Sequence, residues 1–110
     1  MTVYVDDMFK YPMGQFRRMK MSHMIADTEA ELHAMADKIG IARKWYQGDH
    51  YDIAMSKREE AIAAGAVAIT LKQCACMSSL RKHGLPMGDP ATAIERRVAL
   101  ARSYNEGNIP

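Results

Sequence analysis

The sequence predicts a small, single-domain α/β fold: a mostly parallel sheet of about four strands with flanking helices and an extra C-terminal helix. A chain of 110 residues suffices for one hydrophobic core. Hydrophobic residues make up 48% and charged residues 25%, which is typical of a globular protein. Short β-branched or apolar runs alternate with helical patterns, as in parallel sheets with crossover helices. We expect residues 1–85 to form the compact domain and residues 86–110 a helical extension packed on it.

The first elements are expected to be strands. Residues 2–6 alternate in polarity and carry β-branched and aromatic side chains, which favours a strand. Residues 8–16 contain Pro12 and Gly14, which predict a loop. Residues 17–26 alternate basic and apolar side chains and then become apolar, so we expect a second strand there.

A helix follows this strand. Thr28 and Glu31 have the spacing of a capping box, in which each side chain satisfies the free backbone N–H of the other residue. Gly40 is suited to end the helix in a left-handed turn. The apolar stripe at helical spacing consists of Leu32, Met35, Ala36 and Ile39.

The rest of the chain repeats strand and helix. Ser56 and Glu59 again have the capping-box spacing and predict the start of a short helix. Asp89 and Pro90 fit the N-cap and the first position of the last helix. The expected elements are a strand within 45–53, a helix over 56–64, a buried strand over 66–70, and helices over 71–82 and from 89 onward.

Acidic and imidazole side chains gather where three of the expected strands end. In an open α/β sheet, ligands bind outside the carboxyl ends of the strands. If these strands are neighbours, their polar side chains converge on one pocket at that edge of the sheet. The residues concerned are Asp6, Asp7, His23, Asp27, His50 and Asp52.

His50, Asp52 and His23 are the candidate catalytic residues. His50 and Asp52 share one face of their expected strand, opposite the apolar pair Tyr51 and Ile53. A carboxylate near an imidazole fixes its tautomer and raises its pKa, which suits a general base or a metal ligand. A hydrogen-bonded pair that closes a loop is the alternative. His23 joins them because a strand core rarely needs an imidazole.

Asp6 and Asp7 are the candidate metal ligands. Carboxylates at the end of a hydrophobic strand can hold a divalent metal ion, which would be the cofactor of this site. Turn formation after the strand is the alternative, since Asp is common in turns. For Asp27, just before the first helix, capping is the expected role.

Four cations are candidate ligand-binding residues. Lys57 and Arg58 lie in the first turn of the expected second helix, where cations oppose the helix dipole unless an anion is near. Arg17 and Arg18 lie near aromatic residues and could cover the anion or hold a nucleic-acid backbone. Solvated surface charge is the alternative for both pairs.

Composition restricts the other classes of function. A net charge of +2 does not by itself indicate nucleic-acid binding. No apolar run approaches the roughly 20 residues that span a bilayer. The N-terminus lacks a secretory signal pattern, so we expect a cytoplasmic protein without a membrane partner. The common phosphate-binding loops, zinc-protease motifs and serine elbows are absent from the sequence.

Several segments together resemble a known family: 22–28, 31–34, 48–53 and 63–67, with Arg58. The spaced pieces S-H-x-x-x-D, E-L-H and D-H-Y-D are fairly specific as a set. They resemble the bacterial and phage family catalogued as domain of unknown function 4031, over roughly residues 2–85. Some members look fused to HD-type metal-dependent phosphohydrolase domains. The resemblance therefore implies a phage or bacterial accessory protein connected with phosphoester or nucleotide metabolism.

Three functions follow as hypotheses, and the sequence leaves open whether the chain is an enzyme. The first is a metal-assisted hydrolase of phosphoesters or nucleotides. The second is a non-catalytic module that binds a nucleotide, a nucleic acid or a protein. The third is a homo-oligomeric scaffold. A phosphate-bearing small molecule or nucleotide is the favoured partner, ahead of nucleic acid.

Overall fold

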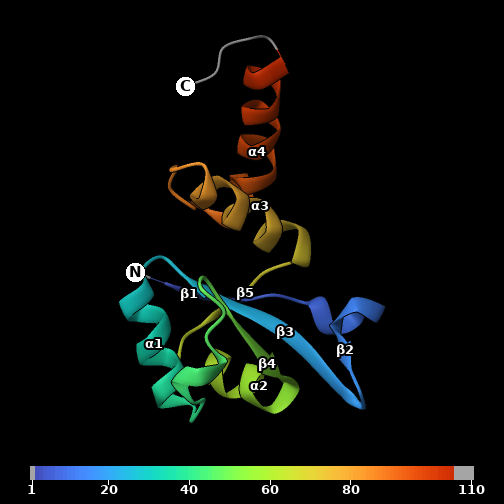
Figure 1. The fold of residues 1–110 in the computed structure, drawn as a ribbon, viewed down its shortest axis with the longest axis vertical. Coiled ribbons are helices and arrows are strands. Elements are labelled where there is room, and N and C mark those ends of the chain that lie inside the picture. Colours follow the sequence, from blue (N-terminus) through green and yellow to red (C-terminus); the bar gives the residue numbers. More distant parts are fainter. Residues whose placement is uncertain (1, 106–110) are drawn as a thin grey trace. The chain divides into compact units, whose positions relative to one another are not determined.

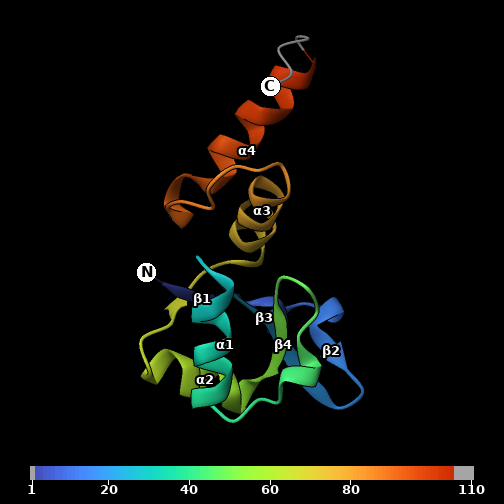
Figure 2. The same cartoon turned by 60° about the vertical axis from the view of Figure 1, so that its left-hand side comes forward.

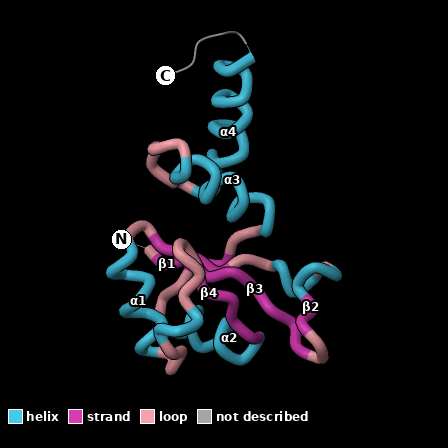
Figure 3. The backbone as a smooth tube through the Cα atoms, viewed as in Figure 1, coloured by secondary structure: helices cyan, strands magenta, loops and turns pink. Residues whose placement is uncertain are grey.

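The computed structural model describes residues 2–105. The chain forms two compact units, Met1–Leu71 and Lys72–Pro110, and each is described by itself. Figure 1 and Figure 3 show the elements of both units. None of the described helices combines the length and the apolar character needed to cross a bilayer.

The first unit contains a five-stranded mixed sheet. Its strands pair in the order β2-β3-β1-β5, and β4 also pairs with β3. β3 runs antiparallel to β1, β2 and β4, whereas β1 and β5 are parallel. The strands are β1 (Val3–Val5), β2 (Gln15–Phe16), β3 (Met19–Ala26), β4 (Tyr51–Ala54) and β5 (Val67–Ala68). The predicted α/β class is confirmed, but the predicted mostly parallel sheet is wrong.

Two connections explain the antiparallel pairs. Between β1 and β3 the chain forms two short 3-10 turns, η1 (Met8–Lys10) and η2 (Pro12–Gly14), and the short strand β2; a connection without a crossover helix favours antiparallel neighbours. Between β3 and β4 the chain runs through α1 (Glu29–Lys38) and then returns along residues 39–50 (Figure 2). This return reverses the chain once more than a simple strand-helix-strand crossover does, so β4 runs opposite to β3.

The predicted N-cap of α1 at Thr28 is confirmed, but the Glu31 carboxylate bonds the Thr28 hydroxyl in place of the backbone N–H that a capping box would use. Thr28 Oγ1 accepts a hydrogen bond of 3.2 Å from the Glu31 backbone N–H and donates one of 2.9 Å to the Glu31 carboxylate. The helix is followed by Gly40 with a φ of +79°, the left-handed conformation that glycine adopts without strain.

The start of α2 (Met55–Ala63) differs from the prediction. Its N-cap is Ala54, which makes no side-chain capping bond, so Ser56 lies inside the first turn. The physical reason is that β4 passes directly into the helix, and the helix begins before the predicted cap. The strand expected over 66–70 is present as β5, but it is shorter than predicted and is not buried, because it lies at the edge of the sheet and Val67 is 43% exposed.

The core of the first unit lies between one face of the sheet and the helices α1 and α2. Alternate residues of the strands point to this face, and the helices contribute their apolar stripes. Its main members are Val3, Val5, Met24, Leu32, Met35, Ala36, Ile39, Tyr51, Ile53 and Ala61. The opposite sheet face carries polar side chains and also buried apolar ones such as Ile25.

The second unit consists mainly of α3 (Leu71–Lys82) and α4 (Pro90–Asn105). Asp89 Oδ1 accepts a hydrogen bond of 2.9 Å from the Ala91 backbone N–H, which confirms the predicted cap of the last helix. The two helices are linked by a hydrogen bond of 2.7 Å from Arg97 Nε to Ser79 Oγ.

Candidate metal centre

Three polar residues lie side by side across three strands of the sheet. His23 is the register partner of Asp52 on β4, and on its other side the Asp6 backbone N–H donates to the His23 carbonyl at 3.0 Å. Their chain neighbours Val5 and Met24 belong to the core. Because side chains alternate along a strand, the three polar side chains occupy the sheet face opposite the core.

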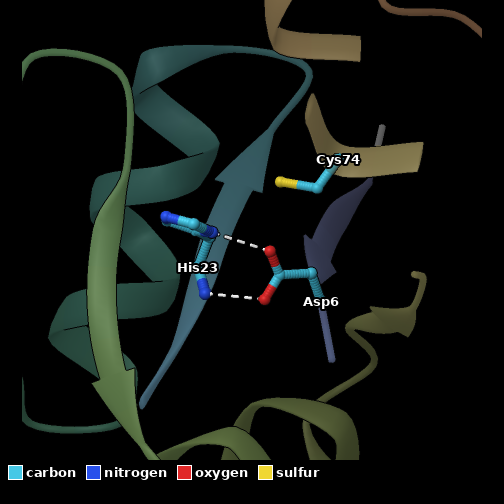
Figure 4. A group of neighbouring side chains, drawn as sticks. All are labelled: Asp6, His23 and Cys74. Atoms are coloured by element: carbon cyan, nitrogen blue, oxygen red, sulfur yellow. Dashed lines mark hydrogen bonds and ion pairs between the residues drawn. The ribbon is translucent and has the colours of Figure 1, made fainter. Parts of the chain in front are cut away.

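Asp6 fixes the orientation of the His23 ring. Asp6 is fully buried, and its Oδ2 lies 2.7 Å from His23 Nδ1 (Figure 4). Its Oδ1 accepts hydrogen bonds of 2.9 Å from the His23 backbone N–H and 3.1 Å from that of Met8. Since an ionised carboxylate only accepts hydrogen bonds, Nδ1 carries the proton. The remaining ring nitrogen, Nε2, is therefore the one with a free lone pair in neutral His23.

These contacts also set the ionisation of Asp6. Burial alone raises the pKa of the Asp6 carboxyl. The hydrogen bonds from His23 and from the backbone outweigh burial, so the pKa of Asp6 lies below its usual 3.8. Asp6 is therefore a buried carboxylate that stays ionised.

His50 is held in the same way as His23. Its Nδ1 lies 2.5 Å from Asp49 Oδ1, so Nδ1 is again the protonated nitrogen. His50 comes immediately before β4, and its ring packs edge-on against His23 with the ring centroids 5.1 Å apart.

The Nε2 atoms of both histidines approach one oxygen of Asp52. His50 Nε2 lies 3.4 Å and His23 Nε2 3.8 Å from Asp52 Oδ1. This oxygen is buried, and none of residues 2–105 donates a well-oriented hydrogen bond to it, whereas Oδ2 accepts one of 2.8 Å from Gln47 Nε2. An ionised oxygen buried without a hydrogen bond is costly. A cation between Oδ1 and the two imidazoles would satisfy it.

The charges of His50 and Asp52 stabilise each other. Interaction with Asp52 is the main cause that raises the pKa of His50 above 6.5; burial opposes the rise and Asp49 adds to it. His50 in turn is the main cause that lowers the pKa of Asp52 below 3.8, against the effect of burial and with help from Gln47. Without a metal ion, a proton on His50 is therefore the cation that this carboxylate favours.

The three side chains have the donor atoms and the spacing of a metal site. One ligand atom from each of His23, His50 and Asp52 lies within 4.8 Å of the others. Around a tetrahedral ion with bonds of about 2.1 Å, ligand atoms are roughly 3.4 Å apart. Two imidazoles and one carboxylate form a common ligand set for Zn²⁺ and Fe²⁺. Their side chains are 23–35% exposed, although Asp52 Oδ1 itself is buried.

The family to which the chain belongs can be identified from its sequence. A family model described as Protein of unknown function (DUF4031) matches residues 3–82. The chain belongs to this family. A search of curated proteins and a search of solved structures each found no match. The matched range contains every residue of the candidate centre, whereas α4 lies outside it.

Two acidic residues of this DUF4031 chain lie outside the cluster. Asp7 Oδ1 accepts a hydrogen bond of 2.6 Å from the Leu71 backbone N–H, and its Oδ2 lies 3.7 Å from Lys10 Nζ. Asp27 accepts hydrogen bonds of 2.9 Å from the Thr2 backbone N–H and 3.2 Å from the Tyr4 hydroxyl. Asp7 thus holds backbone where α3 begins, and Asp27 holds the start of β1.

The candidate phosphate-binding cations have protein contacts of their own. Lys57 Nζ donates to the Ile39 carbonyl at 2.7 Å and lies 3.1 Å from Glu60 Oε2. Arg58 Nε donates to the Asp6 carbonyl at 2.8 Å, and its guanidinium lies over the Phe9 ring. Arg58 is therefore attached to the residue that orients His23.

Arg17 and Arg18 form the turn between β2 and β3, and both are exposed. His23 lies four residues beyond the start of β3, which is roughly 13 Å along an extended strand. The structure therefore does not bring these arginines into the cluster.

Sequence reasoning missed two residues of the site. Asp49 was not singled out, although its position directly before His50 was a signal for a pair of carboxylate and imidazole. Gln47, which binds Asp52 Oδ2, is part of a loop whose path no local pattern predicts.

Proposed function

We propose that this DUF4031 protein binds one divalent transition-metal ion through His23 Nε2, His50 Nε2 and Asp52 Oδ1, and uses it to hydrolyse a phosphoester. The observation that carries the proposal is the approach of both Nε2 atoms to one buried carboxylate oxygen. In the neutral tautomers set by Asp6 and Asp49, two lone pairs face a negative oxygen. This arrangement is repulsive unless a proton or a metal ion lies between them.

The contacts around the ligands support a metal site. Histidines that bind a metal ion commonly donate their other ring N–H to a carboxylate, which fixes the ring and increases its basicity. Asp6 does this for His23, and Asp49 does it for His50. The proposal therefore gives Asp6 a positioning role in place of the ligand role expected from the sequence. Because two ligands are imidazoles, Zn²⁺, Fe²⁺, Co²⁺ or Ni²⁺ suits the site better than Mg²⁺.

Three protein ligands leave a fourth tetrahedral position for water or substrate, which fits a catalytic centre better than a structural one. A metal ion held by these three residues would lower the pKa of a bound water molecule to about 7. In the hydrolysis, the oxygen of that water would bond to phosphorus, the ester P–O bond would break, and the proton lost by the water would pass to the leaving alkoxide. The nearby cations Lys57 and Arg58 support a phosphoester as the substrate, since α2 starts only three residues after Asp52.

Binding without catalysis is the second candidate. The contacts of Lys57 with Ile39 and Glu60 favour it, because a cation that already has protein partners is less available to a phosphate group. In this case the same three ligands would hold a metal ion, and the protein would capture a metal-bound ligand without turning it over.

The proposal is tested by titrating metal-free protein with Zn²⁺ and Co²⁺. We expect one ion per chain, with a Co²⁺ absorption spectrum that includes imidazole nitrogen ligands. His50→Ala and Asp52→Asn should weaken binding by about 100-fold or more, because each removes one of three ligands. His83→Ala is the matched control, since His83 lies in the second unit and bonds the Ser79 carbonyl.

Hydrolysis separates the two candidates. The zinc-, cobalt- and manganese-loaded proteins should cleave bis(4-nitrophenyl) phosphate, and Asp52→Asn should abolish the activity. Tight metal binding without turnover of this ester or of a nucleotide panel would favour the binding protein. Metal binding that is equal in wild type and His50→Ala would contradict both.

A further inference from the structure

A pocket of about 500 Å³ adjoins the candidate centre, and Asp52 forms part of its wall. This volume is within the range of small-molecule sites in proteins. Residues of segments 8–21 and 41–57 line the pocket. The pocket thus joins residues 8–21, a segment with methionines at 8, 13, 19 and 21, to the strand that carries a metal ligand.

The wall of the pocket is rich in thioethers and aromatic rings. It includes Met8, Met13, Met19, Met21, Phe16 and Trp45. Methionine adapts its shape to a ligand, and its sulfur makes favourable contacts with aromatic rings. Gly14 allows this segment to fold tightly, because a Cβ there would lie 2.1 Å from the Met8 carbonyl oxygen.

Two polar side chains in the wall already have partners. Gln47 Nε2 donates to Asp52, and Lys57 Nζ bonds the Ile39 carbonyl and pairs with Glu60. The pocket therefore offers little free charge to a ligand. In contrast, several of its apolar side chains are open to water: Trp45 is 59% exposed and Phe16 62% exposed. Covering such a patch with an apolar ligand is favourable.

We propose that this pocket binds a flat, uncharged aromatic group of the substrate, such as a nucleobase, while the ester of the same substrate lies at the metal ion. The inference rests on the proposed function and adds the substrate class, an aryl or nucleoside phosphoester. Thioether and ring contacts favour an aromatic group over an alkyl chain. Asp52 connects the two subsites, because it faces the histidines and also lines the pocket.

The binding test uses metal-free protein, so it does not depend on catalysis. The methionine methyl groups are labelled with ¹³C, and adenosine is titrated while NMR spectra are recorded. We expect saturable shifts at Met13, Met19 and Met21, and none at Met77 and Met87, which belong to the second unit. Phe16→Ala should weaken adenosine binding about tenfold, whereas His83→Ala should not change it.

Cyclohexanemethanol serves as the non-aromatic control ligand. Equal shifts with both ligands, or shifts spread over the methionines of both units, would overturn the proposal of an aromatic site. Equal adenosine affinity in the wild type and in Phe16→Ala would also overturn it.

The catalytic test uses the zinc-loaded protein with two phosphodiesters of equal charge that share the leaving group 2,2,2-trifluoroethanol and carry either a benzyl or a cyclohexylmethyl group. We expect kcat/KM to be at least tenfold higher for the ester with the aromatic ring, and Phe16→Ala to reduce this preference mainly through KM. Methyl shifts without hydrolysis would support the pocket and contradict the hydrolase. Hydrolysis without shifts and without an aryl preference would support the hydrolase and contradict the pocket.

Discussion

The two faces of the sheet in the first unit are built from the same strands but have different physical roles. Met24 and Tyr51 point to one face, where they are fully buried under the helices. Their chain neighbours His23 and Asp52 point to the other face, where they contact each other and His50. The first face contributes hydrophobic stability, and the second places charged groups in a geometry that a metal ion would stabilise. The following predictions test this separation.

The largest effect on folding is expected at Met24. Met24→Ala removes a fully buried side chain from the core and should lower the free energy of unfolding by about 2–5 kcal/mol. The adjacent His23 keeps its contact with Asp6, so the zinc affinity of the folded protein should change less than threefold. Urea denaturation and calorimetric titration measure the two quantities. A loss of zinc affinity as large as that of Asp52→Asn would show that the faces are not separable.

Asp6→Asn should act mainly on the metal centre. The amide keeps the shape of the carboxylate but loses the negative charge that holds His23 Nδ1–H, so zinc affinity should fall about 10- to 100-fold. Asp7→Asn is the matched control, because Asp7 bonds backbone and is adjacent in sequence. If both variants bind zinc as tightly as the wild type, Asp6 has no positioning role.

The metal-free protein should have a stability maximum at weakly acidic pH. The pKa of Asp6 is lowered, so its contribution is present above about 3.8 and is lost as the pH falls through the folded value. The pKa of His50 is raised, so its contribution is complete below 6.5 and is lost as the pH rises through the folded value.

Denaturation in the presence of a chelator, from pH 3 to pH 9, measures this profile. His50→Asn should flatten the alkaline side and leave the acidic side in place. An unchanged alkaline side in this variant would show that His50 and Asp52 do not interact in solution.

The smallest effect is expected at the turn between β2 and β3. Arg17 has a φ of +59°, a conformation that costs a residue with a Cβ roughly 1–2 kcal/mol. Arg17→Gly relieves this strain but makes the unfolded chain more flexible, so the net change should be below about 1 kcal/mol. Zinc affinity should not change, because the turn lies outside the cluster. A clear loss of zinc affinity in this variant would show that Arg17 contributes to the metal site.

The sequence predicted the local features well, since they depend on neighbouring residues. The cap of α1 at Thr28 and the alternation of Tyr51, Asp52 and Ile53 between two faces are examples. The expectation that His23, His50 and Asp52 meet rested on parallel strands whose carboxyl ends share an edge. The structure brings them together differently, through the antiparallel register of β3 and β4.

Tertiary features were beyond local patterns. A helix between two strands suggested a parallel crossover, but the return along residues 39–50 reverses the chain once more. The partners of Lys57 and Arg58 are backbone carbonyls of Ile39 and Asp6, which only the complete fold places nearby. Similarly, the sequence of residues 8–16 predicts a loop. It does not predict the pocket, because the pocket also needs the distant segment that contains Trp45.

The most direct test of the metal centre is a crystal structure of the zinc-loaded protein with anomalous diffraction at the zinc edge. One strong peak is expected at the sheet face that carries His23 and Asp52. His23 Nε2, His50 Nε2 and Asp52 Oδ1 should each lie about 2.0–2.2 Å from it, with Asp6 and Asp49 still holding the Nδ1 atoms. A fully zinc-loaded crystal with no peak between these three atoms, or with zinc bound only elsewhere, would contradict the proposed metal centre.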